Sequence, residues 1–247
     1  DRKAFLALPV RIYEAIPQWV QPQDEDINVV FDQERNLFFT HGKLQRWLLL
    51  DDTGIVIGRV AAIINEKTAR TFDQPTGGMG FFECINDQKA ANLLFDTCKK
   101  WLLENEMEAM DGPINFGEND RFWGCVVDGF QEPPLYCHNY NPPYYKTLFE
   151  NYGFKTYFNQ LYFRLIFAET NVERYRKLAE RAAQRYKVHA EGMDLNKKEQ
   201  YARDFCEVYN KAWITHNNFK PMTEARALAL LTKLAPVMDP ELMIFAY

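Results

Sequence analysis

The chain has 247 residues, a formal net charge of −5 and an aromatic content of 15%. A chain of this length can bury a substantial core as one large domain or two small ones, and its aromatic content argues against disorder. Because the balance is acidic and no long block of lysine or arginine is present, the sequence offers no electrostatic footprint for nucleic acid. We therefore expect no nucleic-acid partner.

The cysteines, the histidines and the apolar runs indicate the cellular compartment in which the protein occurs. The five cysteines form no CxxC motif and the four histidines lack the spacing of metal ligands, so we expect reduced thiols and no metal site. No apolar run approaches the ~18–20 residues that span a bilayer, and the first residues do not resemble a signal sequence. These features predict a cytoplasmic protein without a membrane partner.

The first elements along the chain are a helix and a hairpin. A weak helical pattern over 5–13 predicts a segment that caps a core. The runs 43–50 and 55–64 are rich in strand-forming residues, and the four residues between them, 51–54, have the composition of a turn that ends in glycine. This arrangement predicts a β-hairpin.

A strand, a long helix and another strand are expected next. Residues 79–85 read as a strand that follows the flexible pair Gly77-Gly78, and residues 108–116 as a further strand. Between them, Asn86 or Asp87 can cap a helix that runs to about Asn105.

The segment from Pro142 to Phe167 predicts a short helix and then a strand. The proline pair at its start presets a helical turn, and Gly153 can take the left-handed conformation that ends a helix. From Lys155 to Phe167 apolar residues mostly alternate with polar ones, which is typical of a half-buried strand.

The composition changes beyond Phe167, where a new unit begins near Thr170. The elements expected there are a charged amphipathic helix, a short strand, two helices and a final strand, at 172–185, 186–191, 197–214, 223–234 and 242–247.

The order of elements over about 43–167 resembles that of the GNAT superfamily of N-acetyltransferases. The sharper match is Leu148-Phe149-Glu150-Asn151-Tyr152-Gly153-Phe154, which is similar to the motif that closes the family's fold. The phrases around Gly80–Glu83, Gly112–Phe116 and Asp128–Phe130 further resemble a bacterial branch in which two GNAT-like units occur in tandem.

The resemblance implies an α/β (α+β) fold with a mixed, mostly antiparallel central sheet flanked by helices. Residues 1–168 would form a GNAT-like domain with an N-terminal helical cap. Residues 169–247 would be the start of a second GNAT-like unit, in the order strand, helix, helix, strand, without its cofactor half.

The resemblance also places a cofactor site. Family members bind acyl-CoA where a central strand splays from its neighbour and the next helix presents free N–H groups to the diphosphate. The matching segment here consists of Cys84, Ile85, Asn86, Asp87, Gln88, Lys89 and Ala90, so acetyl-CoA or another acyl-CoA would be the co-substrate. The segment lacks the family's glycine, and Asp87 at the cap would satisfy the same N–H groups while repelling a phosphate. Lys89 is either a compensating cation or an ordinary solvated lysine.

Acetyl transfer needs a base and an acid within hydrogen-bond reach of the reacting atoms. Phe149 stands where many family members carry tyrosine, and it cannot donate a proton. Tyr145, one turn earlier on the same helical face, is the candidate acid, and the alternative is a packed aromatic ring with a solvated hydroxyl. Glu83, between apolar neighbours, is the candidate base with a raised pKa, or else a structural carboxylate paired with a nearby base.

Three further residues are candidates for substrate binding. Asn115 follows the wall of the cleft and would orient a substrate carbonyl, or else stabilise a turn. Trp123 and Tyr144 belong to an aromatic loop around prolines that would overhang the cleft, which suggests an apolar or aromatic acceptor, or else they pack in the core. The sequence contains no serine, so a Ser-His-Asp site is excluded.

The combined interpretation is an acyltransferase that moves an acetyl or other acyl group from acyl-CoA to a small-molecule or peptide amine. A non-catalytic binding module that keeps the GNAT scaffold and has lost the diphosphate loop is the alternative. An aminoacyl transferase that uses charged tRNA is a further alternative, and the acidic balance weighs against it.

Overall fold

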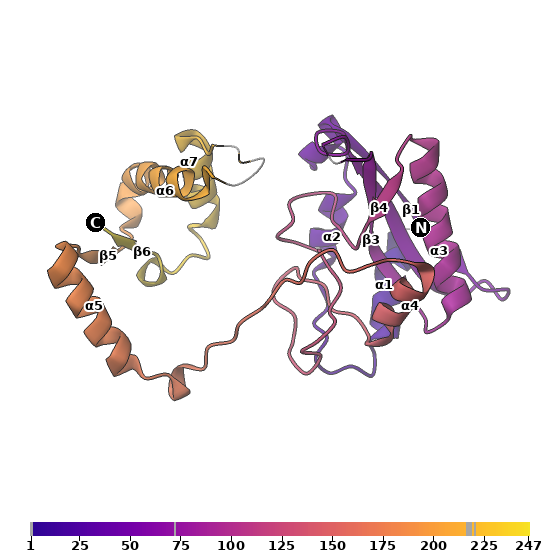
Figure 1. The fold of residues 1–247 in the computed structure, drawn as a ribbon, viewed down its shortest axis with the longest axis horizontal. Coiled ribbons are helices and arrows are strands. Elements are labelled where there is room, and N and C mark those ends of the chain that lie inside the picture. The colour runs from indigo at the N-terminus through magenta and orange to yellow at the C-terminus, as the bar shows by residue number, and fades with distance from the viewer. Residues whose placement is uncertain (1, 72, 216–218, 220) are drawn as a thin grey trace. The chain divides into compact units, whose positions relative to one another are not determined.

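A computed structural model of the chain describes residues 2–71, 73–215, 219 and 221–247. The chain divides into two compact units, 1–159 (unit 1) and 160–247 (unit 2), each with its own hydrophobic core (Figure 1). The sequence placed the boundary after residue 168, and the structure places it after Asn159. The fold class is mixed α/β, as predicted.

Unit 1 is built on an open four-stranded sheet in the order β1-β2-β3-β4. The strands are β1 (Gly42–Leu50), β2 (Val56–Asn65), β3 (Thr76–Cys84) and β4 (Ala109–Asp111). The first three are antiparallel and β4 runs parallel to β3, so the predicted mixed, mostly antiparallel sheet is confirmed.

The predicted hairpin joins β1 to β2, and its turn is held by one carboxylate. Asp51 Oδ1 accepts hydrogen bonds from the backbone N–H groups of Thr53 and Ile55, each at 2.9 Å. Gly54 completes the turn with a φ of 82°, which a glycine adopts without steric cost.

β3 begins earlier than predicted and contains Gly77 and Gly78 instead of following them. A Cβ at Gly78 would lie 2.0 Å from a side-chain atom of Ile114, and one at Gly80 would lie 1.8 Å from the Ile114 carbonyl oxygen. These glycines therefore serve close packing between β3 and the chain after β4, not flexibility before a strand.

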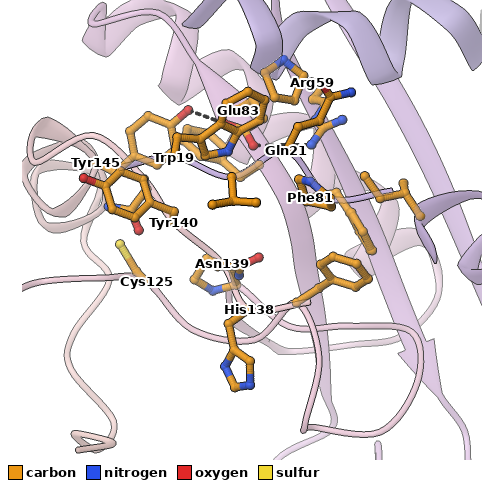
Figure 2. A pocket seen from close by; sticks show the side chains of 18 of the residues that line it. Trp19, Gln21, Arg59, Phe81, Glu83, Cys125, His138, Asn139, Tyr140 and Tyr145 are labelled. Atoms are coloured by element: carbon orange, nitrogen blue, oxygen red, sulfur yellow. Dashed lines mark hydrogen bonds and ion pairs between the residues drawn. The ribbon is translucent and has the colours of Figure 1, made fainter. Parts of the chain in front are cut away.

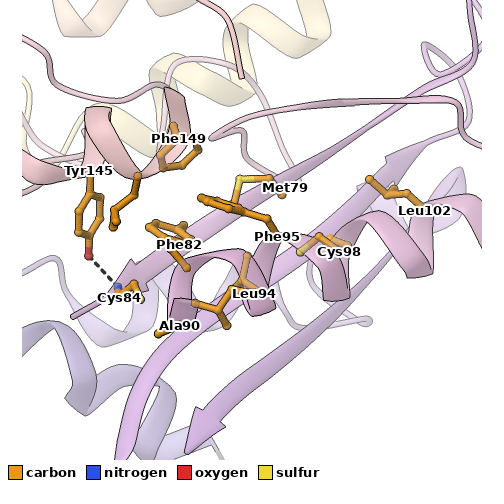
Figure 3. Close-up of a cluster of buried hydrophobic side chains, with 14 of the residues drawn as sticks. Met79, Phe82, Cys84, Ala90, Leu94, Phe95, Cys98, Leu102, Tyr145 and Phe149 are labelled. Atoms are coloured by element: carbon orange, nitrogen blue, oxygen red, sulfur yellow. Dashed lines mark hydrogen bonds between the residues drawn. The ribbon is translucent and has the colours of Figure 1, made fainter. Parts of the chain in front are cut away.

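Helices cover both faces of the sheet because β2 and β3 are apolar on both sides. On one face, Val60, Ala62 and Ile64 of β2 pack with α3 (Gln88–Glu104) and α4 (Tyr144–Tyr152). Figure 3 shows other members of this core, with Phe82 of β3 packed against Phe95 of α3 and Phe149 of α4. On the other face, Ala61 and Ile63 join residues of α1 (Arg2–Ile12) and α2 (Asp24–Val30). This alternation is the two-residue period of a strand.

The helix ends follow the sequence signals. Asp87 caps α3, and its Oδ1 accepts from the N–H groups of Lys89 and Ala90 at 2.7 and 3.0 Å. Gly153 ends α4 in the left-handed region with a φ of 116°, and Tyr145, Leu148 and Phe149 are buried on one face of that helix, as predicted.

Two predicted strands differ from the structure. The strand expected over 108–116 is only β4, because Pro113 has no N–H to continue a ladder. The strand expected over 155–167 is wrong, since the described residues form no strand between α4 and β5 (Ala190–Gly192). An alternating sequence forms a strand only beside a partner strand, and the Phe163 side chain in this run is 90% exposed.

Unit 2 consists of helices around a small core and one short pair of strands. Its helices are α5 (Val172–Tyr186), α6 (Lys198–Trp213) and α7 (Glu224–Leu234), with 3₁₀ turns at Phe167–Glu169, Leu195–Lys197 and Pro240–Leu242. β5 pairs with β6 (Ile244–Ala246) in antiparallel register. The strand expected from Tyr186 starts at Ala190, because α5 continues to Tyr186 and ends at Lys187 in the left-handed region. None of the described helices is long and apolar enough to cross a bilayer.

Candidate functional site

A pocket opens in unit 1 where β3 and the chain after β4 separate. The two segments remain joined as far as the hydrogen bond from Ile114 N–H to the Met79 carbonyl, at 2.7 Å. Beyond it, Phe81 and Glu83 of β3 form one wall of a pocket of about 60 Å³. This volume has room for a few water molecules or a small reacting group, and not for a long chain.

The other walls come from loops and helices that are distant in sequence. The opening is surrounded by residues 19–22, Asp24, Phe122, residues 124–125 and residues 138–141, and Tyr145 of α4 closes one end. Figure 2 shows Glu83 and Tyr145 at one end of the pocket and His138 at the other. Asn141 fixes the loop region, since its side-chain amide exchanges hydrogen bonds with the backbone of Val126 at 2.7 and 3.0 Å.

Glu83 is the centre of a buried polar network, and its side chain also faces this pocket. Its Oε2 accepts hydrogen bonds from the hydroxyls of Tyr13 and Tyr145, both at 2.7 Å. The Tyr13 hydroxyl also lies 2.9 Å from the Tyr140 carbonyl oxygen. The predicted base and the predicted acid are thus in direct contact, and the Tyr145 hydroxyl is buried instead of solvated.

Arg59 is the cation of this network. Its Nη2 lies 3.3 Å from Glu83 Oε1, its Nη1 donates to the Phe5 carbonyl, and its guanidinium carbon lies 4.6 Å from the centre of the Phe5 ring. Arg59 is only 4% exposed, and its Nε–H has no hydrogen-bond partner among the described residues. A buried donor without a partner is costly, and this N–H is shielded from solvent, so Arg59 is held in the network at the expense of one unmade hydrogen bond.

Two tyrosines of α4 close the exposed edge of β3. Ile85 N–H bonds to the Ile57 carbonyl of β2, so the backbone groups of Cys84 point to the opposite side, where no strand lies beside them among the described residues. Cys84 N–H donates to the Tyr145 hydroxyl at 2.9 Å, and the Tyr144 hydroxyl donates to the Cys84 carbonyl at 2.8 Å. Tyr144 therefore holds the strand end.

Burial controls the ionisation of these groups. Desolvation raises the pKa of Glu83 above its ordinary value, while Arg59, Tyr13 and Tyr145 oppose that rise. Desolvation and the nearby Glu83 raise the pKa of Tyr145. Cys125 also lines the pocket, and burial raises the pKa of its thiol to about 12, so it is protonated near pH 7 and is a poor nucleophile.

The predicted cofactor segment lies outside the pocket lining, at the start of α3. Asn86, Asp87 and Lys89 are at the surface, whereas Cys84 and Ala90 are buried and Ile85 packs against the core. Gln88 is tied to α4, with its Nε2 3.0 Å from the Leu148 carbonyl and its Oε1 accepting from Asn151.

The predicted substrate residues do not gather at the pocket. Asn115 is buried near it without lining it, and its Nδ2 lies 3.4 Å from the Glu118 carbonyl, which matches the turn-stabilising alternative. Trp123 is partly buried, and its neighbours Phe122 and Gly124 line the pocket instead. The described residues contain no cluster of potential metal ligands.

The sequence reasoning missed Tyr13 and Arg59. Arg59 carried a usable signal, because it is a charged residue inside the otherwise apolar strand run 55–64, and such a residue needs a buried partner. Tyr13 carried none, since its contact with Glu83 joins residues 70 positions apart.

The comparisons with known proteins identify two distant relatives. The bacterial ceramide synthase of Caulobacter vibrioides is 28% identical over 253 aligned positions, which cover 100% of this chain and 64% of that protein. Protein YghO of Escherichia coli is 23% identical and the chain covers 62% of it. The chain therefore spans less than two thirds of the length of either relative. No family model matches the chain, and no solved structure matches it.

Proposed function

We propose that this chain is part of an enzyme that transfers an acyl group from a thioester to an amine, with Glu83 as the general base. The observation that carries the proposal is a buried carboxylate of raised pKa that faces a pocket and is held by Arg59, Tyr13 and Tyr145. The similarity to a protein named ceramide synthase supports acyl transfer, because a ceramide is the amide of a long-chain amine.

These residues can carry the proton transfers that the reaction requires. The amine nitrogen attacks the carbonyl carbon of the thioester, so that a C–N bond forms and the C–S bond breaks. Glu83 takes the proton that nitrogen loses, and the departing thiolate gains a proton to leave as a thiol. Tyr145, which donates to Glu83, positions the carboxylate and gives it a path for returning the proton.

The pocket size limits what is bound inside it. About 60 Å³ holds the reacting amine and carbonyl groups, and the remainder of a long acyl chain or amine lies outside. The apolar lining residues Phe81 and Phe122 favour an aliphatic acceptor over a highly charged one.

The residues at the start of α3 do not fit a coenzyme A diphosphate in the usual manner. The N–H groups of Lys89 and Ala90 already donate to Asp87, whose carboxylate would repel a phosphate. We therefore propose that acyl-CoA donates its acyl group with only the thioester bound in the pocket. We assign no binding site to its diphosphate.

The direct test is product formation by the full-length protein with long-chain acyl-CoA and a long-chain amino alcohol. The proposal predicts release of free thiol together with an amide product in mass spectrometry. Absence of both with any acyl-CoA and amine supplied, from protein shown to be folded, would refute it.

A binding module is the second candidate, and the occupied N–H groups of α3 favour it. Calorimetric titration separates the two, because this candidate predicts no heat of binding with acetyl-CoA or long-chain acyl-CoA at millimolar concentration. Measurable binding of either acyl-CoA would contradict this candidate.

A further inference from the structure

The helix α5 of unit 2 presents an apolar face that the described residues of unit 2 leave uncovered. All its residues are exposed or only partly buried, and none belongs to the core formed around α6 and α7. Tyr175 is 59% exposed, Leu178 49% and Tyr186 64%. A protein surface rarely leaves such side chains together in water without a use.

The apolar residues of α5 share one side of the helix. With about 100° of rotation per residue, they fall within an arc of about 140°. We call this arc the α5 apolar face, and its members are Val172, Tyr175, Leu178, Ala179, Ala182, Ala183 and Tyr186.

Basic residues border this face on both sides. Arg174, Arg181 and Arg185 lie toward one margin, and Arg176 lies beside the other. Glu173 and Glu180 lie on the opposite side, and Glu173 pairs with Lys177 at 3.7 Å and with Arg176 at 2.5 Å. Five basic and two acidic residues give α5 a formal charge of +3, within a chain whose charge is −5.

We propose that α5 is an interfacial helix that binds the surface of an anionic lipid bilayer. A helix lying in the bilayer surface needs an apolar face to enter the acyl-chain boundary and basic margins to reach the phosphates. Tyr175 and Tyr186 supply rings with a polar tip, which favour the same region. This surface binding differs from a membrane-spanning segment, and it is an alternative to the prediction that the protein has no membrane partner.

The charges favour a lipid surface over a second copy of the chain. In a symmetric dimer the same patch faces itself, so the arginine margins of one α5 would lie against those of the other. Like charges in that position oppose association. An anionic bilayer instead matches the sign of both margins.

The purpose of membrane binding rests on the proposed function, because a long-chain amine resides in a bilayer. The test of membrane binding is independent of the proposed function. Sedimentation of the full-length protein with vesicles requires no substrate. We expect binding to vesicles of phosphatidylcholine that contain phosphatidylglycerol, weaker binding at high salt, and little binding to phosphatidylcholine alone.

A matched pair of variants locates the contact. Leu178→Glu places a charge in the α5 apolar face and should weaken vesicle binding at least about tenfold. Gln184→Glu makes the same change in charge on the opposite side of α5 and should change binding less than about threefold. Both positions are exposed, so circular dichroism should show the fold intact.

Three results would overturn the inference. The first is failure of the wild-type protein to bind anionic vesicles. The second is binding of Leu178→Glu to these vesicles that equals that of Gln184→Glu. The third is an oligomer that Leu178→Glu dissociates in size-exclusion chromatography while vesicle binding stays unchanged. A failure here leaves the assay of thiol release unaffected, so it is distinguishable from failure of the proposed function.

Discussion

Globular proteins usually bury apolar side chains and expose charged ones, and the two units depart from this rule in opposite ways. Unit 1 keeps charged groups inside, with Glu83 and Arg59 paired in the pocket wall, whereas unit 2 leaves the α5 apolar face outside. Each arrangement is unfavourable by itself, because buried ions lose hydration and exposed apolar groups order water. Buried charges in unit 1 fit a role in chemistry, whereas exposed apolar side chains in unit 2 fit a role in binding a surface.

The largest expected effect comes from breaking the buried pair of unit 1. Arg59→Met leaves Glu83 without its cation and should lower the free energy of unfolding by about 3–5 kcal/mol. The matched control is Arg70→Met, because Arg70 pairs with Glu106 at 3.0 Å at the surface, and its loss should amount to less than about 1 kcal/mol. Urea denaturation measures both, and equal losses would show that the buried network is not special.

The second prediction compares two leucines of unit 2. Leu231→Ala empties a buried site in α7 and should cost about 2–5 kcal/mol, while Leu178→Ala in α5 should cost less than about 0.5 kcal/mol. Thermal unfolding measures the two variants. A comparable cost for Leu178→Ala would mean that α5 is packed in solution, which contradicts an exposed face.

The third prediction compares two hydroxyls that donate to carboxylates. Tyr13→Phe removes a buried donor to Glu83 and should cost about 1.5–3 kcal/mol. Tyr136→Phe removes an exposed donor to Asp26, which lies 2.8 Å from the hydroxyl, and water can replace it at a cost below about 0.5 kcal/mol. Chemical denaturation gives both values, and the reverse order would place the network outside the core.

The smallest predicted effect is a dependence of stability on pH. Burial raises the folded-state pKa of Glu83 above its ordinary value of 4.5, so the folded chain holds this proton more tightly than the unfolded chain. The stabilising contribution is therefore present below pH 4.5 and is lost as the pH rises through the folded-state pKa. Unfolding of wild type and Glu83→Gln across this range measures it, because the wild type should lose stability relative to Glu83→Gln as the pH rises. A wild type that gains stability relative to Glu83→Gln with rising pH would contradict the raised pKa.

The sequence predicted those parts of the fold that depend on local signals. The turn at Asp51–Gly54, the cap at Asp87 and the glycine stop at Gly153 each act within a few residues, and the structure confirms them. The strand expected over 155–167 was wrong because a strand depends on a neighbour that the local pattern does not specify. Gly77 and Gly78 were misread for a similar reason, since the side chains that pack on them come from distant segments.

The candidate site was predictable only in part. Glu83 and Tyr145 were selected from their residue types and positions, and in the structure the Tyr145 hydroxyl lies 2.7 Å from Glu83 Oε2. Their partners Tyr13 and Arg59 come from other elements, and only the fold shows that all four meet. Whether these residues catalyse acyl transfer stays a prediction.

The most direct test of the account is the pH–rate profile of acyl transfer by the full-length protein, with wild type compared to Glu83→Gln. If Glu83 is the general base, the rate of thiol release should fall by about 10²–10⁴-fold in Glu83→Gln, and the rise in rate with pH that ionisation of Glu83 produces should disappear. Tyr145→Phe should shift that rise in rate while retaining part of the activity, which separates positioning from proton transfer. A folded Glu83→Gln enzyme within about twofold of wild type at every pH would contradict the central claim.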